Sequence, residues 1–195
     1  MFVYVKGNNN NIYTIYGTTT GYYNFNIDGA DDEGNIGTLT CVDLAGGLVF
    51  TRANNGLNAN TTVTITNLNC LYTNMAQGIA NESKYPNQPM LSLPAGKLAT
   101  LKNLHMTYTG EDATAMEGKL LKNLRPYFIT AGGVEKVIIE DCSFIDTNTK
   151  GIKVTGLNAT GNGQYLIKNT EIKGFYGIAS TAKHMDVVDS KITAS

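Results

Sequence analysis

One six-residue phrase recurs five times in this chain, and it constrains the fold more than any single residue does. The phrase consists of an apolar residue, any residue, Asn or Asp, two free positions and a second apolar residue. Its copies occupy residues 65–70, 101–106, 139–144, 167–172 and 187–192. Recurrence after 36, 38, 28 and 20 residues is typical of a coiled β-solenoid, because each turn must place the same bend and the same core residue beside the last.

The residues that precede each Asn or Asp alternate between apolar and other positions. The apolar residues four and two positions earlier are Val63 and Ile65, Ala99 and Leu101, Val137 and Ile139, Tyr165 and Ile167, and Met185 and Val187. A period of two indicates one strand in each copy with its apolar face turned inward. A second apolar stretch comes before each of these strands, at 48–50, 90–93, 127–129, 152–154 and 178–179. Each repeat is therefore predicted to hold at least two strands.

The Asn or Asp of each copy is predicted to form a corner between strands. We call these five the corner residues: Asn67, Asn103, Asp141, Asn169 and Asp189. Asn and Asp tolerate the left-handed backbone region, and their side chains bond to neighbouring backbone groups. Side by side in successive turns, they can also bond to one another. We interpret them as a structural turn ladder and not as catalytic groups.

The repeat also divides the chain. Residues 46–195 are predicted to form one continuous domain of coils, whereas residues 1–45 fit the repeat less well and are interpreted as degenerate first coils or an N-terminal cap. Two longer insertions, at 72–89 and 107–126, leave the repeat at the same point, so we expect them on one flank. Ala113, Met116, Leu120 and Leu124 have helical spacing, which predicts a short α-helix in the second insertion.

Composition excludes several classes of function. Charged residues make up 16% of the chain and its net charge is −1, which argues against nucleic-acid binding. No apolar run is long enough to span a membrane. Of the three cysteines, Cys70 and Cys142 would lie about 9–10 Å apart on strands separated by about 4.8 Å each. Disulfides span at most about 7 Å between Cα atoms, so we expect both thiols to be unpaired core residues.

No cofactor or metal site is predicted. The tight acidic cluster at 31–33 lies in a Gly-flanked loop, and it lacks the converging oxygen ligands that a calcium site needs. A solvated turn explains it. Cys-x-x-Cys, phosphate-loop and serine-hydrolase motifs are absent from the sequence, which removes the usual signatures of those chemistries.

With these features the chain resembles right-handed parallel β-helix proteins, the fold shared by pectate lyases, polygalacturonases, phage tailspikes and many bacterial surface proteins. The resemblance covers residues 46–195 and rests on the periodicity of the five phrases. It implies an all-β fold, a right-handed parallel β-helix with two longer loop insertions. The resemblance implies no particular activity, because proteins with one fold can have many different functions.

The resemblance does indicate which catalytic groups to look for. Polygalacturonase-like hydrolases combine clustered aspartates with Gly-His-Gly and Arg-x-Lys segments, and neither His105 nor His184 has that setting. Pectate-lyase-like enzymes use calcium-binding aspartates with an Arg or Lys base. We therefore predict no catalytic residue and favour a protein that is not an enzyme. The alternative is a polysaccharide lyase or glycoside hydrolase with an atypical site near Arg125, Glu111 and Asp112.

A binding role has more support in the sequence. Four tyrosines fall in or beside the two insertions: Tyr72, Tyr85, Tyr108 and Tyr127. Exposed aromatic faces beside polar groups suit sugar rings, so these tyrosines, with Arg125, Glu111 and Asp112, form the candidate glycan site. The other interpretation is that the tyrosines pack the insertions onto the solenoid.

The preferred hypothesis is a non-catalytic β-helix module of an extracellular, cell-surface or virion protein, a rigid scaffold that binds glycans. The last phrase ends at Ile192 without a polar cap after it. An uncapped solenoid exposes strand edges and core, so we expect further domains or copies of the chain to cover it. The third hypothesis is a purely structural subunit that assembles into a fibre or spike.

Overall fold

The structure is a computed structural model of the protein. It describes residues 13–17, 24–41, 48–52, 60–72, 89–93, 95–110, 127–147 and 154–194. These residues form strands, turns and bends without a helix. In particular, they include no helix of the length and apolar character that crossing a membrane requires. The fold is all-β, as the sequence predicts.

The smaller of two sheets has six strands, which lie in chain order. They are β1 (Tyr13–Gly17), β4 (Leu48–Arg52), β6 (Pro89–Ser92), β8 (Tyr127–Thr130), β11 (Thr155–Ala159) and β14 (Ile178–Ser180). Each strand pairs in parallel with the next. Four of these strands, β4, β6, β8 and β14, overlap the apolar stretches that precede the repeat phrases. Of the stretch at 152–154 the structure describes Val154, which directly precedes β11.

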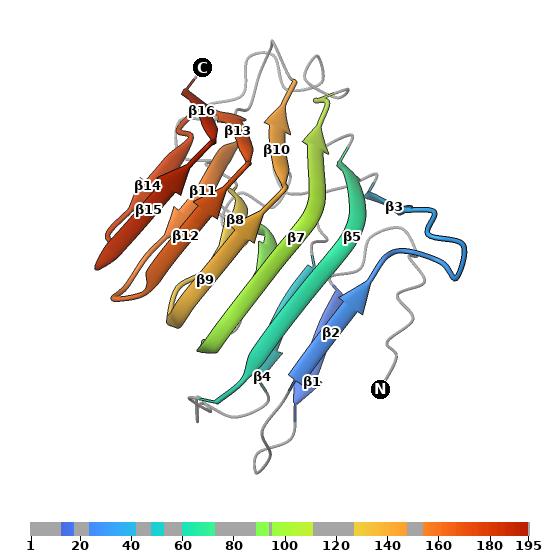
Figure 1. Ribbon diagram of the computed structural model, residues 1–195, viewed down its shortest axis with the longest axis horizontal. Helices are drawn as coiled ribbons and strands as arrows, with labels where there is room; N and C mark the ends of the chain where they lie inside the picture. Colours follow the sequence, from blue (N-terminus) through green and yellow to red (C-terminus); the bar gives the residue numbers. More distant parts are fainter. Residues whose placement is uncertain are drawn as a thin grey trace, which may run out of the picture.

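The larger sheet contains the repeat phrases (Figure 1). Before the corners run β2 (Asn24–Asp28), β9 (Val134–Glu140), β12 (Gln164–Lys168) and β15 (His184–Val188); after the corners run β3 (Gly37–Cys41), β10 (Ser143–Asp146), β13 (Glu171–Gly174) and β16 (Lys191–Ala194); β5 (Thr62–Tyr72) and β7 (Gly96–Tyr108) pass through their corners. Figure 1 shows this sheet curling, with its strands side by side in the order of the chain.

The register of the larger sheet reproduces the repeat. Ile65 of β5 stands opposite Leu101 of β7, Leu101 opposite Ile139 of β9, Ile139 opposite Ile167 of β12, and Ile167 opposite Val187 of β15. All these pairs are parallel. The prediction of a fold made mainly of parallel strands is therefore confirmed. Among the described residues, one isolated bridge, between Ala30 and Ile36, is antiparallel.

The core is built from the predicted inward positions. Ile65, Leu101, Ile139 and Ile167 are all 0% exposed. The apolar residue that ends each phrase forms a second buried series, with Cys70, Met106, Phe144 and Ile172. The smaller sheet adds Met90, Phe128, Ile129 and Leu157 from the other side, and the rings of Phe128 and Phe144 have centroids 6.4 Å apart. Burial of these side chains stabilises the fold by about 1.5–3 kcal/mol each.

Several expectations fall partly or wholly on residues that the structure does not describe. The helix expected around 113–124 and most of the insertion at 72–89 belong to this group. The described strands of the N-terminal region join the same two sheets as the rest, because β1 pairs with β4 and both β2 and β3 pair with β5.

Candidate functional site

An open groove of about 450 Å³ lies where the larger sheet bends at its corners. Its lining comes from four neighbouring segments of the larger sheet, and most of the lining residues are polar. The lining residues are His105, Asp141, Cys142, Ser143, Asn169, Thr170, Glu171, Asp189 and Lys191. The groove is formed by the repeat itself, because the last three phrases each contribute their corner residue and the position two residues later, and the phrase at 101–106 contributes His105.

Three of the five corner residues, Asp141, Asn169 and Asp189, supply the first wall of the groove. All five are the non-glycine residues with positive φ in the described parts of the chain, with φ values from 46° to 56°. This left-handed conformation costs most L-residues about 1–2 kcal/mol, but Asn and Asp adopt it more readily because their short polar side chains bond locally. The bend at each repeat therefore follows from the residue type at the third position of the phrase.

The corner amides bond across neighbouring strands in one direction. Asn103 Nδ2 donates to Asn67 Oδ1 at 2.8 Å, and Asn67 Nδ2 donates to Asp28 Oδ1 at 3.0 Å. A second run begins further on, where Asn169 Nδ2 donates to Asp141 Oδ1 at 2.7 Å. Each amide thus donates to the residue of the preceding repeat, and each run begins at an aspartate, which accepts but cannot donate.

A second series of polar side chains lines the groove two residues after the corners. His105 Nδ1 lies 2.8 Å from Ser143 Oγ, and His105 Nε2 lies 2.9 Å from Asn103 Oδ1. Because Asn103 donates its amide hydrogen to Asn67, its oxygen accepts from Nε2–H of His105. Nδ1 is then left to accept the hydrogen of the Ser143 hydroxyl. The corner ladder in this way fixes the orientation of both groups.

The same series continues with a pair of charges. Lys191 Nζ donates to Glu171 Oε1 at 2.9 Å, and the Lys191 side chain is 75% exposed. An exposed pair of this kind contributes about 0–1 kcal/mol to stability. Its charges therefore remain available to a polar ligand in the groove at little structural cost.

Cys142 is present at the groove but is poorly suited to chemistry. Burial raises the pKa of its thiol to about 11, and the negative charge of Asp141 acts in the same direction. Hydrogen bonding with the backbone of Leu104, Glu140 and Asn103 opposes the shift. The reactive form of cysteine is the thiolate, which is scarce at neutral pH for such a group. Neither Cys70 nor Cys142 forms a disulfide, and both are buried, as the strand spacing predicts.

The groove offers hydroxyl, amide, imidazole, carboxylate and ammonium groups within one surface. Such a mixture of donors and acceptors is suited to hydrogen-bonding a polyhydroxylated ligand.

In the described parts of the chain, no three His, Cys, Asp or Glu side chains converge in a way that could hold a metal ion. The acidic segment at 31–33 is an exposed turn, in which Asp31 Oδ1 accepts from the backbone N–H groups of Glu33 and Asn35. Those bonds and the side-chain amide of Asn35 lower the pKa of Asp31.

The structure corrects part of the tyrosine site. Tyr72 and Tyr108 stand opposite each other in register and are each 1% exposed. Their rings therefore pack in the core and offer no face to a sugar. Tyr127 is half-buried at the start of β8, and Tyr85, Glu111, Asp112 and Arg125 lie outside the described residues.

Sequence reasoning missed the series two residues after the corners. The signal was present, because this position holds a polar residue in every phrase: Asn69, His105, Ser143, Glu171 and Lys191. No single residue type recurs there, so the repeat phrase leaves the position free. His105 of this series is half-buried and bonded on both ring nitrogens.

A run of exposed charges flanks the corners on the other side. Glu140 lies between Lys102, at 3.6 Å, and Lys168, at 3.3 Å. Lys102 also approaches the carboxylate of Asp141 to 3.9 Å.

Comparison with protein-family models, curated proteins and solved structures gives no match for this chain.

Proposed function

We propose that the chain is a non-catalytic module of an extracellular, cell-surface or virion protein, built as a right-handed parallel β-solenoid that serves as a rigid scaffold. The observation that carries the proposal is the parallel register of Ile65, Leu101, Ile139, Ile167 and Val187 in five neighbouring strands. Repeating units that contact only their neighbours give elongated, stiff molecules. An experimental structure that resolves the winding between the two sheets tests the architecture directly.

We propose further that the scaffold binds glycan in the corner groove. The lining groups recur on neighbouring parallel strands, which are about 4.8 Å apart, so they present a regular row of donors and acceptors to an extended chain of sugars. Ser143 and His105 are held in place by the corner ladder. Glu171 and Lys191 add one acceptor and one donor further along the row.

A glycan array probed with the full chain tests this binding. Glu171→Ala and Ser143→Ala each remove one lining group and are expected to lower affinity at least about tenfold, the effect of losing one well-formed hydrogen bond to a charged or oriented group. Glu135→Ala is the matched control, since Glu135 is an exposed glutamate of β9 outside the groove. Equal binding by all three variants, or no array binding by the parent, removes the glycan role.

One observation favours the enzymatic alternative, a polysaccharide lyase or glycoside hydrolase. Asp141 and Asp189 both line the groove two strands apart, with Glu171 also in it. Two strand spacings amount to about 9.6 Å, near the upper end of the separation of about 6.5–9.5 Å between the carboxyl groups of inverting glycosidases. Incubation with acidic and neutral polysaccharides tests it. New reducing ends or unsaturated products that disappear in Asp141→Asn or Asp189→Asn would establish an enzyme and overturn the non-catalytic proposal.

A further inference from the structure

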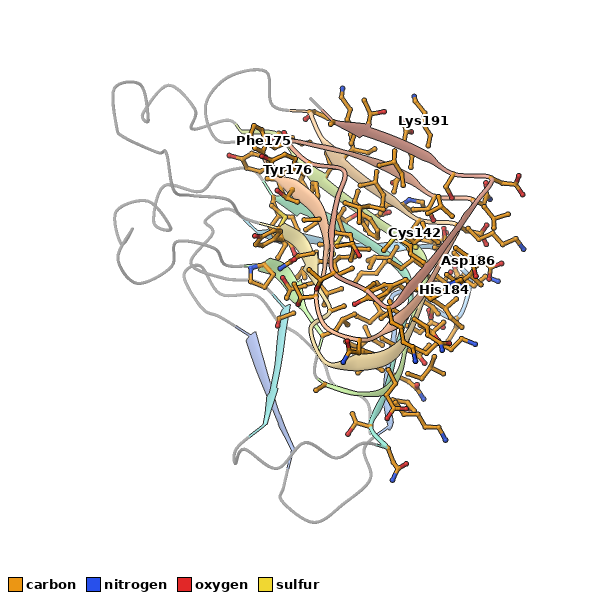
Figure 2. The ribbon with its side chains drawn as sticks, turned by 90° about the vertical axis from the view of Figure 1, so that its left-hand side faces the viewer. Cys142, Phe175, Tyr176, His184, Asp186 and Lys191 are labelled. Carbon is orange, nitrogen blue, oxygen red and sulfur yellow. The ribbon has the colours of Figure 1, made fainter. Side chains whose placement is uncertain are left out.

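The apolar series of the core reach the surface at one edge of the fold. Ile139 and Ile167 are 0% exposed, but Val187, the next member of their series, is 45% exposed. The series that contains Ile172, also 0% exposed, continues to Ile192 at 38%. Figure 2 looks onto this edge, with labelled side chains on β15 and β16. The same side chains that form the core in β12 and β13 are therefore uncovered in β15 and β16.

The backbone of this edge is also unpaired. Within the described residues, β15 pairs with β12 alone, β16 with β13 alone and β14 with β11 alone. Each of the three thus presents one row of N–H and C=O groups without a strand partner. Such an edge is a template for one more strand.

The corner ladder specifies what that strand should carry. Each run of the ladder begins at an aspartate, Asp28 or Asp141, whose carboxylate accepts an amide hydrogen from the Asn of the following repeat. Asp189 is the next aspartate in the series, directly after β15. Among the described residues, no side-chain amide donates to it. By the pattern of the first two runs, Asp189 is the acceptor that begins a third run.

We propose that the edge formed by β14, β15 and β16 binds one further parallel segment that carries the same repeat phrase with Asn at its corner. The Asn amide donates to the carboxylate of Asp189. The apolar residue two positions before that Asn covers Val187, and the one three positions after it covers Ile192. The segment extends the existing parallel register, so its backbone pairs with β15 and β16 as those strands pair with β12 and β13.

The opposite edge of a second copy does not meet this description. There the residue at the corner position is Gly29, which follows the pairing of Asp28 with Thr66. Its backbone N–H donates to the carbonyl oxygen of Thr66, and it has no side-chain amide to donate to Asp189. A Cβ placed on Gly29 would lie 2.2 Å from the carbonyl oxygen of Asn67, so glycine is required at that corner. Head-to-tail association of identical copies would therefore leave the Asp189 carboxylate without its donor.

The test fuses a copy of residues 155–174 after Ser195 of the full chain. This copy contains the phrase with Asn169, and its apolar residues are those of β12 and β13. We expect amide hydrogen exchange of residues 184–194 to slow at least tenfold relative to the unfused chain. A fusion whose copied Ile167 and Ile172 are both changed to Ser is the control for added length. Far-UV circular dichroism checks that the strand content of residues 1–195 is retained in each fusion.

The ladder bond is tested separately. Changing the copied Asn169 to Ala, or Asp189 to Ala, is expected to lower the added protection of residues 184–194 from hydrogen exchange about tenfold. Each change deletes one hydrogen bond to a charged group. The double variant should lose no more than either single one. Protection that is the same with Ala as with Asn would overturn the requirement for Asn. Absence of any added protection in the parent fusion would overturn the docking edge.

The unfused chain provides the remaining comparison. Its mass in solution and the exchange of residues 184–194 are measured over a range of protein concentrations. A monomer with fast exchange at this edge supports the proposal. Slow exchange that depends on concentration would mean that a second copy covers the edge, and it would overturn the assignment of an Asn-bearing segment.

Discussion

Replacement of one corner residue tests the physical basis of the bend. Asn67 has φ of 53°, donates to Asp28 Oδ1 and accepts from Asn103 Nδ2. Asn67→Ala keeps a Cβ in the left-handed region but removes both side-chain bonds. Asn67→Gly also removes the bonds, yet it relieves the backbone. The two variants therefore separate the contribution of the backbone conformation from that of the ladder.

The expected magnitudes follow from these contacts. The left-handed conformation costs Ala about 1 kcal/mol more than Asn. The bond to Asn103 contributes about 1 kcal/mol, whereas the bond to the solvent-exposed Asp28 adds little. Asn67→Ala should therefore lower the free energy of unfolding by about 2 kcal/mol. For Asn67→Gly the backbone is relieved but the unfolded chain gains entropy, which gives a loss of about 1.5 kcal/mol.

Urea unfolding followed by far-UV circular dichroism measures both values, since the chain contains no Trp to report by fluorescence. In thermal unfolding the Ala variant should melt about 4–8 °C below the parent. Asn69→Ala is the matched control: Asn69 is in the same strand, without positive φ, and should change stability by less than about 0.5 kcal/mol. A loss in Asn67→Ala no larger than in the control, or a larger loss in Gly than in Ala, would refute the reasoning.

Three further perturbations test other parts of the structure. Cys142 should react with iodoacetamide about 100-fold more slowly at pH 7 than an ordinary thiol, because a pKa of about 11 against 9.0 leaves one hundredth of the thiolate; peptide-resolved mass spectrometry measures this, and rapid labelling of the folded chain would contradict it. Tyr165→Phe removes the buried bond from the Tyr165 hydroxyl to the carbonyl oxygen of Ala131 at 2.9 Å and should cost about 1 kcal/mol in urea. Burial raises the pKa of Tyr165 above its usual value of 10.0, so the stability that its protonated form provides is present below that pH and is lost as pH rises above it; alkaline unfolding should therefore shift to higher pH in the Phe variant, and an unchanged midpoint would count against this cause. Gly156→Ala would place a Cβ 2.3 Å from the carbonyl oxygen of Gly177 and should cost about 3 kcal/mol or prevent folding. By contrast, Gly161→Asn, at a turn with φ of 91°, would place its Cβ at an ordinary contact distance of 3.6 Å from the backbone nitrogen of Gly133 and should cost about 1 kcal/mol or less by the same urea assay.

The repeat phrase allowed much of the sheet to be predicted. Its apolar positions specify which face is buried, since a shift of one residue would turn every side chain to the other face. The residues with positive φ coincide with the Asn or Asp of each phrase, because few other residues adopt that conformation readily. Local chemistry at one position was enough in these cases.

The groove could not be predicted in the same way. Its second wall combines His105, Ser143, Glu171 and Lys191, which share a place in the register but no residue type. Only the pairing of strands that are 20–38 residues apart brings them together. Tyr72 and Tyr108 show the opposite error, since proximity to the insertions suggested exposure while the alternation of β5 and β7 places both rings inside.

The unequal intervals between the paired strands also bear on how the chain folds. Closing a 38-residue interval costs about 0.5 kcal/mol more than closing one of 20 residues, so pairing is entropically cheapest between β12 and β15. That pair gains little burial, however, because Val187 stays 45% exposed. The pairing of β9 with β12 has an interval of only 28 residues and buries Ile139 and Ile167 completely. We therefore expect nucleation at β9 and β12, with growth outward in both directions, an order that pulse-labelled hydrogen exchange during refolding can establish.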